Sequence, residues 1–518
     1  MAGQASTAST TAVPGTAESI EVRRPADGTV IGNVPVHTAA DVAAMAAQLR
    51  EAQVEWEAIG PHGRRLWLQR LRDWMLDNED RLTELVVAES GKVHQDASVE
   101  VPTCVDIINY YAEHAEAFMA DRRERPHSPA YLTKQLKVVH RPHPLVGVIT
   151  AWNFPLVSPL IDVPPALAAG CAVLSKPSEA APLAWGEVVR GWREDLAAPP
   201  VLACATGFGE TGAAVVDAVD MVQFTGSAAT GRRIGIRCAE RMIPAGLELG
   251  GKDAMIVLAD ADLERAANGA VWGGFFNAGQ VCVSVERVFV EAPVYDAFVE
   301  KVVEKTRALR QGPERGPFGA DVGALVTDAQ LQIVARHVDD ALARGAKAPV
   351  GGGRRPGQYF EPTVLTDVTA DMECMTEETF GPTLPVMKVA DADEAVRLAN
   401  ASEYGLSAAV YSKDHARAEA VGRRLEVGTV NINNSAINVF QLSVPMGGWK
   451  NSGLGARSGG ADGLLKYCRS QTITVDRFEP ASELIWFPYT QTKGRIFSTV
   501  SRLIGGRDLR RRFGMRPR

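Results

Sequence analysis

The sequence predicts an α/β fold in which parallel strands alternate with helices and form doubly wound sheets. Short apolar runs alternate with longer helical segments from about residue 144 to residue 450, as expected for such sheets. Several runs end in loops of small and polar residues, which is where open α/β sheets bind ligands. The chain has 518 residues, too many for one small core, so we expect two or more domains.

Composition restricts the classes of function. The hydrophobic share of 46% and the charged share of 23% are typical of a soluble globular protein, and no apolar run is long enough to span a bilayer. A net charge of −7 argues against nucleic acid as a general partner. The seven cysteines are dispersed without a CxxC pair, so we expect a reducing, cytoplasmic location and no metal site. Residues 1–20 lack the regions of a secretory signal, and we expect a disordered tail there.

The N-terminal third is predicted to be mainly helical. It starts with a β-hairpin over 24–36, because Asp27-Gly28 separates two Val- and Ile-containing segments. Thr38 and Asp41 offer N-cap chemistry for the first helix. Helices are expected over 38–59, 65–88, 99–119 and 164–170.

Two groups of strands follow from the pattern of apolar residues. Two segments, 132–140 and 471–475, resemble exposed or edge strands. The remaining strands are short apolar runs of buried type, expected at 146–150, 172–175, 201–205, 221–224, 254–258, 286–291, 384–389, 408–411 and 429–432.

One cysteine and one glutamate form a candidate catalytic pair. Cys282 lies in FFNAGQVCVS (275–284), and Glu248 lies in LELGGK (247–252). A thiolate nucleophile with a carboxylate base is an arrangement used in covalent catalysis. Burial between leucines is expected to raise the pKa of Glu248, which would make it a usable base near neutral pH. A lone cysteine is more often a buried, inert residue, so the assignment depends on the neighbouring motifs.

Those motifs resemble the aldehyde dehydrogenase superfamily from about Glu21 to Arg477. Their order along the chain is typical of that family, and several ordered motifs are far more specific than any one alone. They are AWNFP (151–155), KPSE (176–179), FTGSAATG (224–231), LELGGK, GQVC, ETFGP (378–382) and PMGGWKNSG (445–453).

The resemblance implies a domain organisation. A Rossmann-like dinucleotide-binding domain would comprise 21–127 and 144–250, and a second α/β domain, 251–450, would be catalytic. A small β arm from 128–143 and 468–480 would join subunits into a homodimer or homotetramer.

The resemblance also implies a reaction with Cys282, Glu248, Asn153 and Lys176 as the catalytic set. Cys282 would attack an aldehyde, hydride transfer to a nicotinamide would leave a thioester, and Glu248 would activate water to release a carboxylic acid. The Asn153 amide and the Cys282 N–H would bind the developing oxyanion, and such donors are typically worth about 2.7–4 kcal/mol each. Relatives that acylate coenzyme A often lack this glutamate, so its presence favours hydrolysis.

NAD is the expected cofactor. Glu179 would accept a hydrogen bond from the ribose 2′-hydroxyl and repel a 2′-phosphate, so NADP is less favoured. FTGSAATG has small residues where a strand turns into a helix, which suits a pyrophosphate. The cofactor-binding residues that the resemblance implies are Trp152, Lys176, Ser178, Glu179, Gly209, Gly212, Phe224, Thr225, Gly226, Ser227, Thr230, Leu249, Gly250, Glu378 and Phe380.

The substrate is expected to be an apolar aliphatic or aromatic aldehyde. The candidate pocket residues are mostly apolar, and no arginine in these segments marks a carboxylate pocket, so a semialdehyde is the second choice. The competing functions are those of an NADP-linked or coenzyme A-acylating relative, a catalytically silent scaffold, and a thiol esterase or peptidase. The residues expected to line the pocket are Phe154, Val157, Val281, Val283 and Phe440.

The chain continues past the family's usual end. Residues 481–518 contain LIWFPY (484–489) and then apolar residues at helical spacing beside Arg495, Arg502 and Arg507. A basic amphipathic helix can lie on an anionic membrane or pack on a neighbouring subunit. Peripheral membrane contact through this extension is therefore one expectation.

Overall fold

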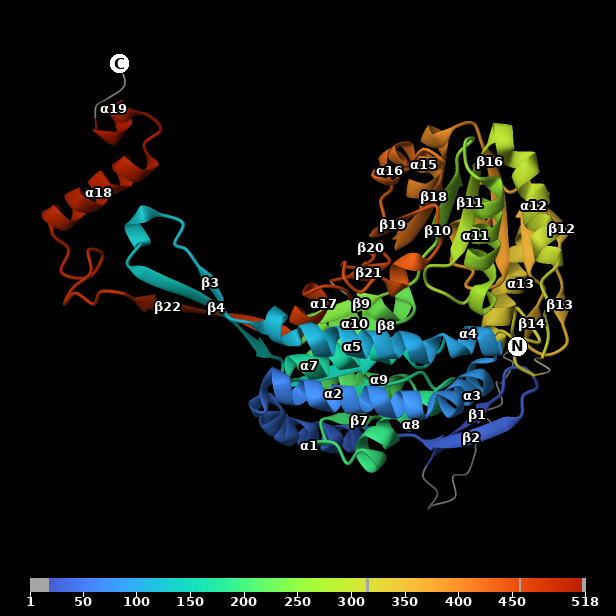
Figure 1. The fold of residues 1–518 in the computed structure, drawn as a ribbon, viewed down its shortest axis with the longest axis horizontal. Helices are drawn as coiled ribbons and strands as arrows, with labels where there is room; N and C mark the ends of the chain where they lie inside the picture. The colour runs from blue at the N-terminus through green and yellow to red at the C-terminus, as the bar shows by residue number, and fades with distance from the viewer. Residues whose placement is uncertain (1–17, 314–315, 456–457, 515–518) are drawn as a thin grey trace, which may run out of the picture. The chain divides into compact units, whose positions relative to one another are not determined.

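The computed structural model describes residues 18–313, 316–455 and 458–514. The chain divides into two compact units. One runs to Ala115 and continues from His143 to Tyr467, and the other comprises Glu116–Pro142 and Cys468 onward. The first unit contains both large sheets (Figure 1). The boundary expected at residue 250 falls between these two sheets.

The first unit begins with a β-hairpin formed by β1 (Ser19–Arg23) and antiparallel β2 (Val30–Pro35). Its first strand lies before the predicted range of 24–36, whereas the turn includes Asp27-Gly28 as predicted. Gly28 in its turn has a φ of +74°, which glycine adopts without strain. Ser19 and Ile20 already belong to β1, so the expected disordered tail extended two residues too far. Residues 1–17 of that tail lie outside the described residues.

The predicted helices are present, except that one of them is divided into two. Thr38 and Asp41 form a capping box at the start of α1 (Ala39–Ala58). The helix expected over 65–88 is two helices that meet at Asn78. The Asn78 side chain donates a hydrogen bond to the Trp74 carbonyl at 2.8 Å, and such local bonds compete with a continuous helix. The helices that follow α1 are α2 (Gly60–Asp77), α3 (Glu79–Ser90), α4 (His94–Ser98) and α5 (Glu100–Met119).

The first large sheet has the strand order of a dinucleotide-binding fold. Its order is β21-β9-β8-β5-β6-β7, parallel except for β21. The chain goes from β5 to β6 on one side and returns to β8 on the other, so a crevice is expected beyond the ends of β5 and β8. The strands are β5 (Leu145–Ile149), β6 (Ala172–Lys176), β7 (Leu202–Cys204), β8 (Met221–Thr225), β9 (Ala245–Glu248) and β21 (Gly453–Leu454). Helices α1, α7 (Val163–Ala169), α9 (Gly209–Ala218) and α10 (Ala228–Glu240) pack against this sheet.

The second large sheet has the order β12-β15-β16-β11-β10-β18-β19, and only β12 is antiparallel to its neighbour. Its strands are β10 (Asp253–Val257), β11 (Val285–Glu291), β12 (Lys347–Val350), β15 (Thr363–Thr366), β16 (Thr383–Val389), β18 (Ser407–Tyr411) and β19 (Thr429–Ile432). Its covering helices are α11 (Leu263–Phe275), α12 (Tyr295–Arg307), α13 (Asp328–Ala343), α15 (Ala392–Asn400) and α16 (His415–Gly422) (Figure 1). Together they bury one large apolar core, and the α/β prediction is confirmed.

The second unit has its own antiparallel sheet. β22 (Cys468–Asp476) pairs along its whole length with β4 (Lys134–Pro142), and β4 also pairs with β3 (Arg122–Glu124). The two exposed strands predicted from distant parts of the sequence are therefore neighbours. The C-terminal segment forms α18 (Gln491–Gly505) and α19 (Leu509–Arg512). None of the helices among the described residues has the length and apolar character needed to cross a membrane.

Candidate active site

A cavity of about 330 Å³ opens at the crevice that the strand order predicts. Its walls come from the loops after β5, β8 and β9 and from the segments before β11 and β16. Most of the predicted site residues line it, from both sheets. They are Trp152, Asn153, Phe154, Val157, Thr225, Gly226, Ser227, Glu248, Leu249, Gly250, Val281, Cys282, Glu378, Phe380 and Phe440.

Cys282 follows an unusual turn that is held by hydrogen bonds. Asn277, Ala278 and Gly279 all have left-handed backbones, with φ of 51°, 54° and 74°. The Asn277 N–H donates to the Asp96 carboxylate at 2.9 Å, and its side-chain amide donates to the Asn153 carbonyl at 3.0 Å. A Cβ at Gly279 would lie 2.1 Å from the carbonyl oxygen of Gly381. This position therefore needs glycine both for its conformation and for space.

Asn153 is tied to the same turn. Its buried side-chain amide donates to the Gln280 carbonyl at 3.0 Å, two residues before the cysteine. The donor expected to stabilise an oxyanion therefore lies on the wall that also carries Cys282. This placement fits the role that the sequence predicts.

Glu248 reaches the cavity from the opposite sheet. It is the last residue of β9, its side chain is buried, and it lines the cavity together with Cys282. The Gly226 N–H donates to the Glu248 carbonyl at 3.0 Å, which joins the ends of β8 and β9. The predicted base and nucleophile therefore share one chamber.

A second group of predicted residues lies along the first sheet and does not line this cavity. Lys176 ends β6, and its ammonium group lies 3.3 Å from the half-exposed Glu179 carboxylate. Gly209 starts α9 with no atom within 4 Å of where a Cβ would be. At Gly212 a Cβ would lie 3.9 Å from Lys176 Cδ. The group consists of Lys176, Ser178, Glu179, Gly209, Gly212, Phe224 and Thr230.

These residues fit a dinucleotide. Ser227 caps the 13-residue helix α10 by accepting from the Thr230 N–H, and a helix N-terminus favours an anion such as a pyrophosphate. A Cβ at Gly226 would lie 2.6 Å from Phe224 Cζ, so the turn stays open only with glycine. The Thr225 hydroxyl is buried, lines the cavity and lacks a hydrogen-bond partner among the described residues.

Glu378 and Phe380 reach the cavity from the segment before β16 of the second large sheet. The Gly251 N–H donates to Glu378 Oε1 at 2.9 Å, and a Cβ at Gly250 would lie 2.2 Å from the other carboxylate oxygen. Burial, followed by the charge of Glu286, raises the pKa of Glu378 to about 8. The Phe380 ring meets the Trp152 ring edge-on, with centroids 5.5 Å apart.

Two buried ion pairs behind the cavity were not predicted. Lys252 and Glu286 lie 2.6 Å apart, and Glu286 also accepts from the backbone N–H groups of Thr379 and Phe380 at 2.8 Å. A glutamate inside the apolar run of β11 was the available sequence signal, because a charge in a buried strand requires a partner.

The other pair is Lys92–Glu100, also 2.6 Å apart and fully buried. Glu100 accepts from the N–H groups of Leu156 and Val157 at 3.0 and 3.1 Å. The Lys92 ammonium group lies 3.6 Å from the centre of the Phe154 ring. This pair therefore holds the AWNFP loop as Lys252–Glu286 holds the ETFGP loop.

The substrate end of the cavity is apolar. Val283 was predicted to line it but is not among the lining residues; it is buried in a small apolar cluster behind Val281 and Met446, which do line the cavity. None of the described lining residues is a lysine, arginine or histidine. Apolar or aromatic lining residues that were not individually predicted are Val99, Ile161, Trp272, Phe276, Ile333, Val439 and Met446.

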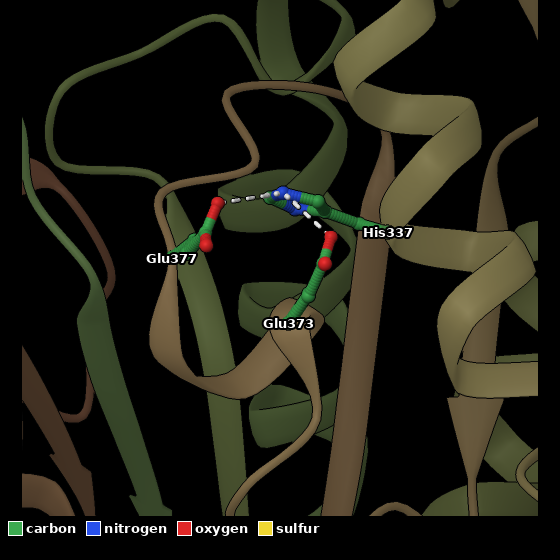
Figure 2. A group of neighbouring side chains, drawn as sticks. All are labelled: His337, Glu373 and Glu377. Carbon is green, nitrogen blue, oxygen red and sulfur yellow. Dashed lines mark ion pairs between the residues drawn. The ribbon is translucent and has the colours of Figure 1, made fainter. Parts of the chain in front are cut away.

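A histidine and two glutamates gather outside the cavity (Figure 2). His337 Nε2 lies 3.5 Å from Glu377 and 3.8 Å from Glu373. Arg336 donates to both carboxylates, at 2.8 and 2.9 Å, and so offsets part of their charge. His337 Nδ1 lies 3.1 Å from the Thr379 hydroxyl. The cluster therefore extends the hydrogen-bond network of the ETFGP loop, and we assign no metal to it.

Comparison with known proteins agrees with this geometry. A model of the aldehyde dehydrogenase family matches residues 12–473. The chain belongs to the aldehyde dehydrogenase family. The predicted family and fold are confirmed.

Several family members are similar over most of their length. "Putative succinate-semialdehyde dehydrogenase (NADP+) 2" of Mycobacterium ulcerans is 41% identical over 459 residues, with 87% of each chain covered. The 4,4'-diapolycopene aldehyde oxidase of a Methylomonas species is 39% identical over 490 residues, covering 93% of this chain and 91% of that protein. The solved structure of an NAD-dependent aldehyde dehydrogenase from Sinorhizobium meliloti has a TM-score of 0.86 and 33% identity, covering 91% and 93% of the two chains.

Proposed function

We propose that this protein oxidises an apolar aldehyde to its carboxylic acid with NAD. The observation that carries the proposal is the apolar wall around Cys282 and Glu248, which among the described residues includes no cationic side chain. A semialdehyde carries a carboxylate, and burying that charge without a partner is costly. An apolar chain would instead gain about 0.8 kcal/mol for each buried methylene group.

The chain's own residues support a covalent route. The Cys282 thiolate adds to the aldehyde carbon, while the Asn153 amide and the Cys282 N–H donate to the oxygen that becomes negative. Bound NAD supplies the hydride acceptor. Glu248 takes a proton from water, the hydroxide adds to the thioester carbon, and the acid leaves as the C–S bond breaks and the thiolate re-forms.

The relatives support different substrates. The Mycobacterium protein is named for succinate semialdehyde, whereas the Methylomonas protein is named for 4,4'-diapolycopene aldehyde. The apolar wall favours the second kind of substrate for this chain.

Glu179 supports NAD over NADP. Its carboxylate lies beside Lys176 at the end of β6, where it would accept from a ribose 2′-hydroxyl and repel a 2′-phosphate. The relatives include both NAD-linked and NADP-linked names, so the preference rests on this residue.

The test is steady-state oxidation of hexanal, octanal, decanal, benzaldehyde and succinate semialdehyde with NAD or NADP, with Cys282→Ala as the blank. Two added methylene groups should raise kcat/KM up to about tenfold until the cavity is filled. Succinate semialdehyde should be the poorest substrate, and kcat/KM should be higher with NAD than with NADP. A preference for succinate semialdehyde would overturn the substrate assignment, and a preference for NADP would overturn the role given to Glu179.

A further inference from the structure

The C-terminal extension, residues 481–518, exposes an unusual amount of apolar surface. Phe487 and Tyr489 are 76% and 72% exposed. Soluble proteins rarely leave large contiguous apolar patches uncovered unless a partner or a membrane covers them. The exposed apolar and aromatic side chains of the described part are Ile485, Trp486, Phe487, Tyr489, Ile496, Phe497, Leu503, Ile504, Leu509 and Phe513.

Within α18 these side chains form one stripe. Ile496, Phe497, Leu503 and Ile504 recur at intervals that place them on one face of a helix, and Val500 lies between them. The opposite face carries Gln491 and Ser498. With 15 residues, α18 is shorter than the roughly 20 needed to span a bilayer.

The extension also differs in charge from the chain as a whole. Residues 481–518 carry nine lysines and arginines against two acidic residues, whereas the whole chain carries 55 against 62. Arg495 and Arg502 lie on the polar face of α18, with Gln491 and Ser498, and Arg510, Arg511 and Arg512 follow in α19. Basic residues beside an apolar helix face complement anionic lipid headgroups over acyl chains.

We propose that the extension docks on an anionic membrane surface, with α18 in the plane of the interface. The apolar stripe would enter the acyl boundary, the arginines would contact lipid phosphates, and Trp486 and Tyr489 would lie at headgroup depth. Nucleic acid would complement the positive charge of the extension, but it would leave the apolar stripe exposed to water.

The test is co-sedimentation of the full-length protein with vesicles of phosphatidylcholine alone or with about 30% phosphatidylglycerol. A stripe variant, Phe497→Glu with Leu503→Glu, is compared with a control of equal charge change on the opposite face, Gln491→Glu with Ser498→Glu. We expect at least about tenfold stronger binding to the anionic vesicles, weakened by about 0.5 M salt. The stripe variant should lose at least about tenfold in affinity, and the control should lose much less.

Three results would overturn the proposal. One is equal binding of the protein to both kinds of vesicle. Another is an equal loss of affinity for anionic vesicles in the stripe and control variants. The third is a change of oligomeric state in the stripe variant, which would assign the stripe to a second copy of the chain. The described part of the extension contributes no residue to the cavity described above, so oxidation of a water-soluble aldehyde should be unchanged in both variants. The membrane proposal and the proposed function can therefore fail independently.

Discussion

Seven cysteines occur in the chain, and Cys282 is the one that lines the catalytic cavity. Burial raises the pKa of Cys204 to about 12 and that of Cys374 to about 11. Thiols with such pKa values stay protonated near neutral pH, and the protonated form is a poor nucleophile. Cys282 is placed differently, because it follows the turn at Asn277, Ala278 and Gly279 and faces the cavity.

Glu248→Gln separates the two halves of the reaction. A glutamine keeps the shape of the side chain and removes the base, so thioester formation should continue while hydrolysis slows. We expect a rapid burst of about one NADH per active site, followed by steady turnover reduced about 10²- to 10⁴-fold. Stopped-flow measurement of NADH absorbance would follow both phases. Cys282→Ala should show neither phase, and a Glu248→Gln variant with normal turnover would remove Glu248 from the mechanism.

Glu378 is expected to give cofactor binding a pH dependence. Its raised pKa, about 8, means that the free enzyme holds this carboxyl neutral at pH 7. The ionised form is the better partner for ribose hydroxyls and the positive nicotinamide, so NAD should bind more tightly as pH rises through 8. The free enzyme loses stability over the same rise, because a folded-state pKa above the unfolded value favours the protonated folded form.

The measurement is the Kd of NAD from tryptophan fluorescence between about pH 6.5 and 9, a range that spans the raised pKa. Glu378→Gln cannot ionise and should give a nearly flat profile over this range. A profile of the same slope in both proteins would assign the pH dependence to another group.

At the scale of elements, two loops meet at the cavity, and each is held from behind by a buried Lys–Glu pair. Glu100 binds the backbone after AWNFP, and Glu286 binds the backbone of ETFGP. Each carboxylate accepts hydrogen bonds from two backbone N–H groups, and two such bonds fix the direction of the loop more strictly than one hydrogen bond would. Loops on rigid supports keep reactive groups in place.

Glu286→Gln should therefore damage cofactor use as well as stability. The change leaves the Lys252 charge buried and unbalanced and weakens the bonds to Thr379 and Phe380. We expect KM for NAD to rise by about tenfold or more. The matched control is Glu291→Gln on the same strand, where Glu291 is buried and bonds to Ala259 and Arg417. Both variants should lower the melting temperature, and equal effects on KM would contradict a positioning role for Glu286.

The sequence predicted the strands and the loops that follow them, because strand periodicity and small-residue turns are local properties. The strand-end motifs after β5 and β8 therefore led directly to the crevice. The Lys252–Glu286 pair joins residues 34 positions apart. Its role in holding the ETFGP loop depends on burial, which no local sequence pattern shows. Val283 was predicted to line the cavity because it is next to Cys282, but the order of residues in a turn does not show which neighbour reaches the cavity.

At the scale of the whole molecule, β22 presents apolar side chains to solvent. Ile473 and Val475 are 39% and 49% exposed in the single chain. They alternate with Thr472 and Thr474, so they lie on one face of the strand. An exposed apolar strand face is expected to be covered in the assembled protein. This agrees with the oligomerisation role that the family resemblance implies for 468–480.

Ile473→Lys with Val475→Lys should shift the protein towards smaller assemblies. Burying two lysines without partners at a subunit contact is unfavourable, so the oligomer should dissociate at least about tenfold more readily. Multi-angle light scattering across a dilution series would measure this shift. Thr472→Lys with Thr474→Lys adds the same charge on the other face and should have a smaller effect. If both variants kept the parent mass at every concentration, the sheet of β22, β4 and β3 would have another role, and the subunit contact would lie elsewhere on the chain.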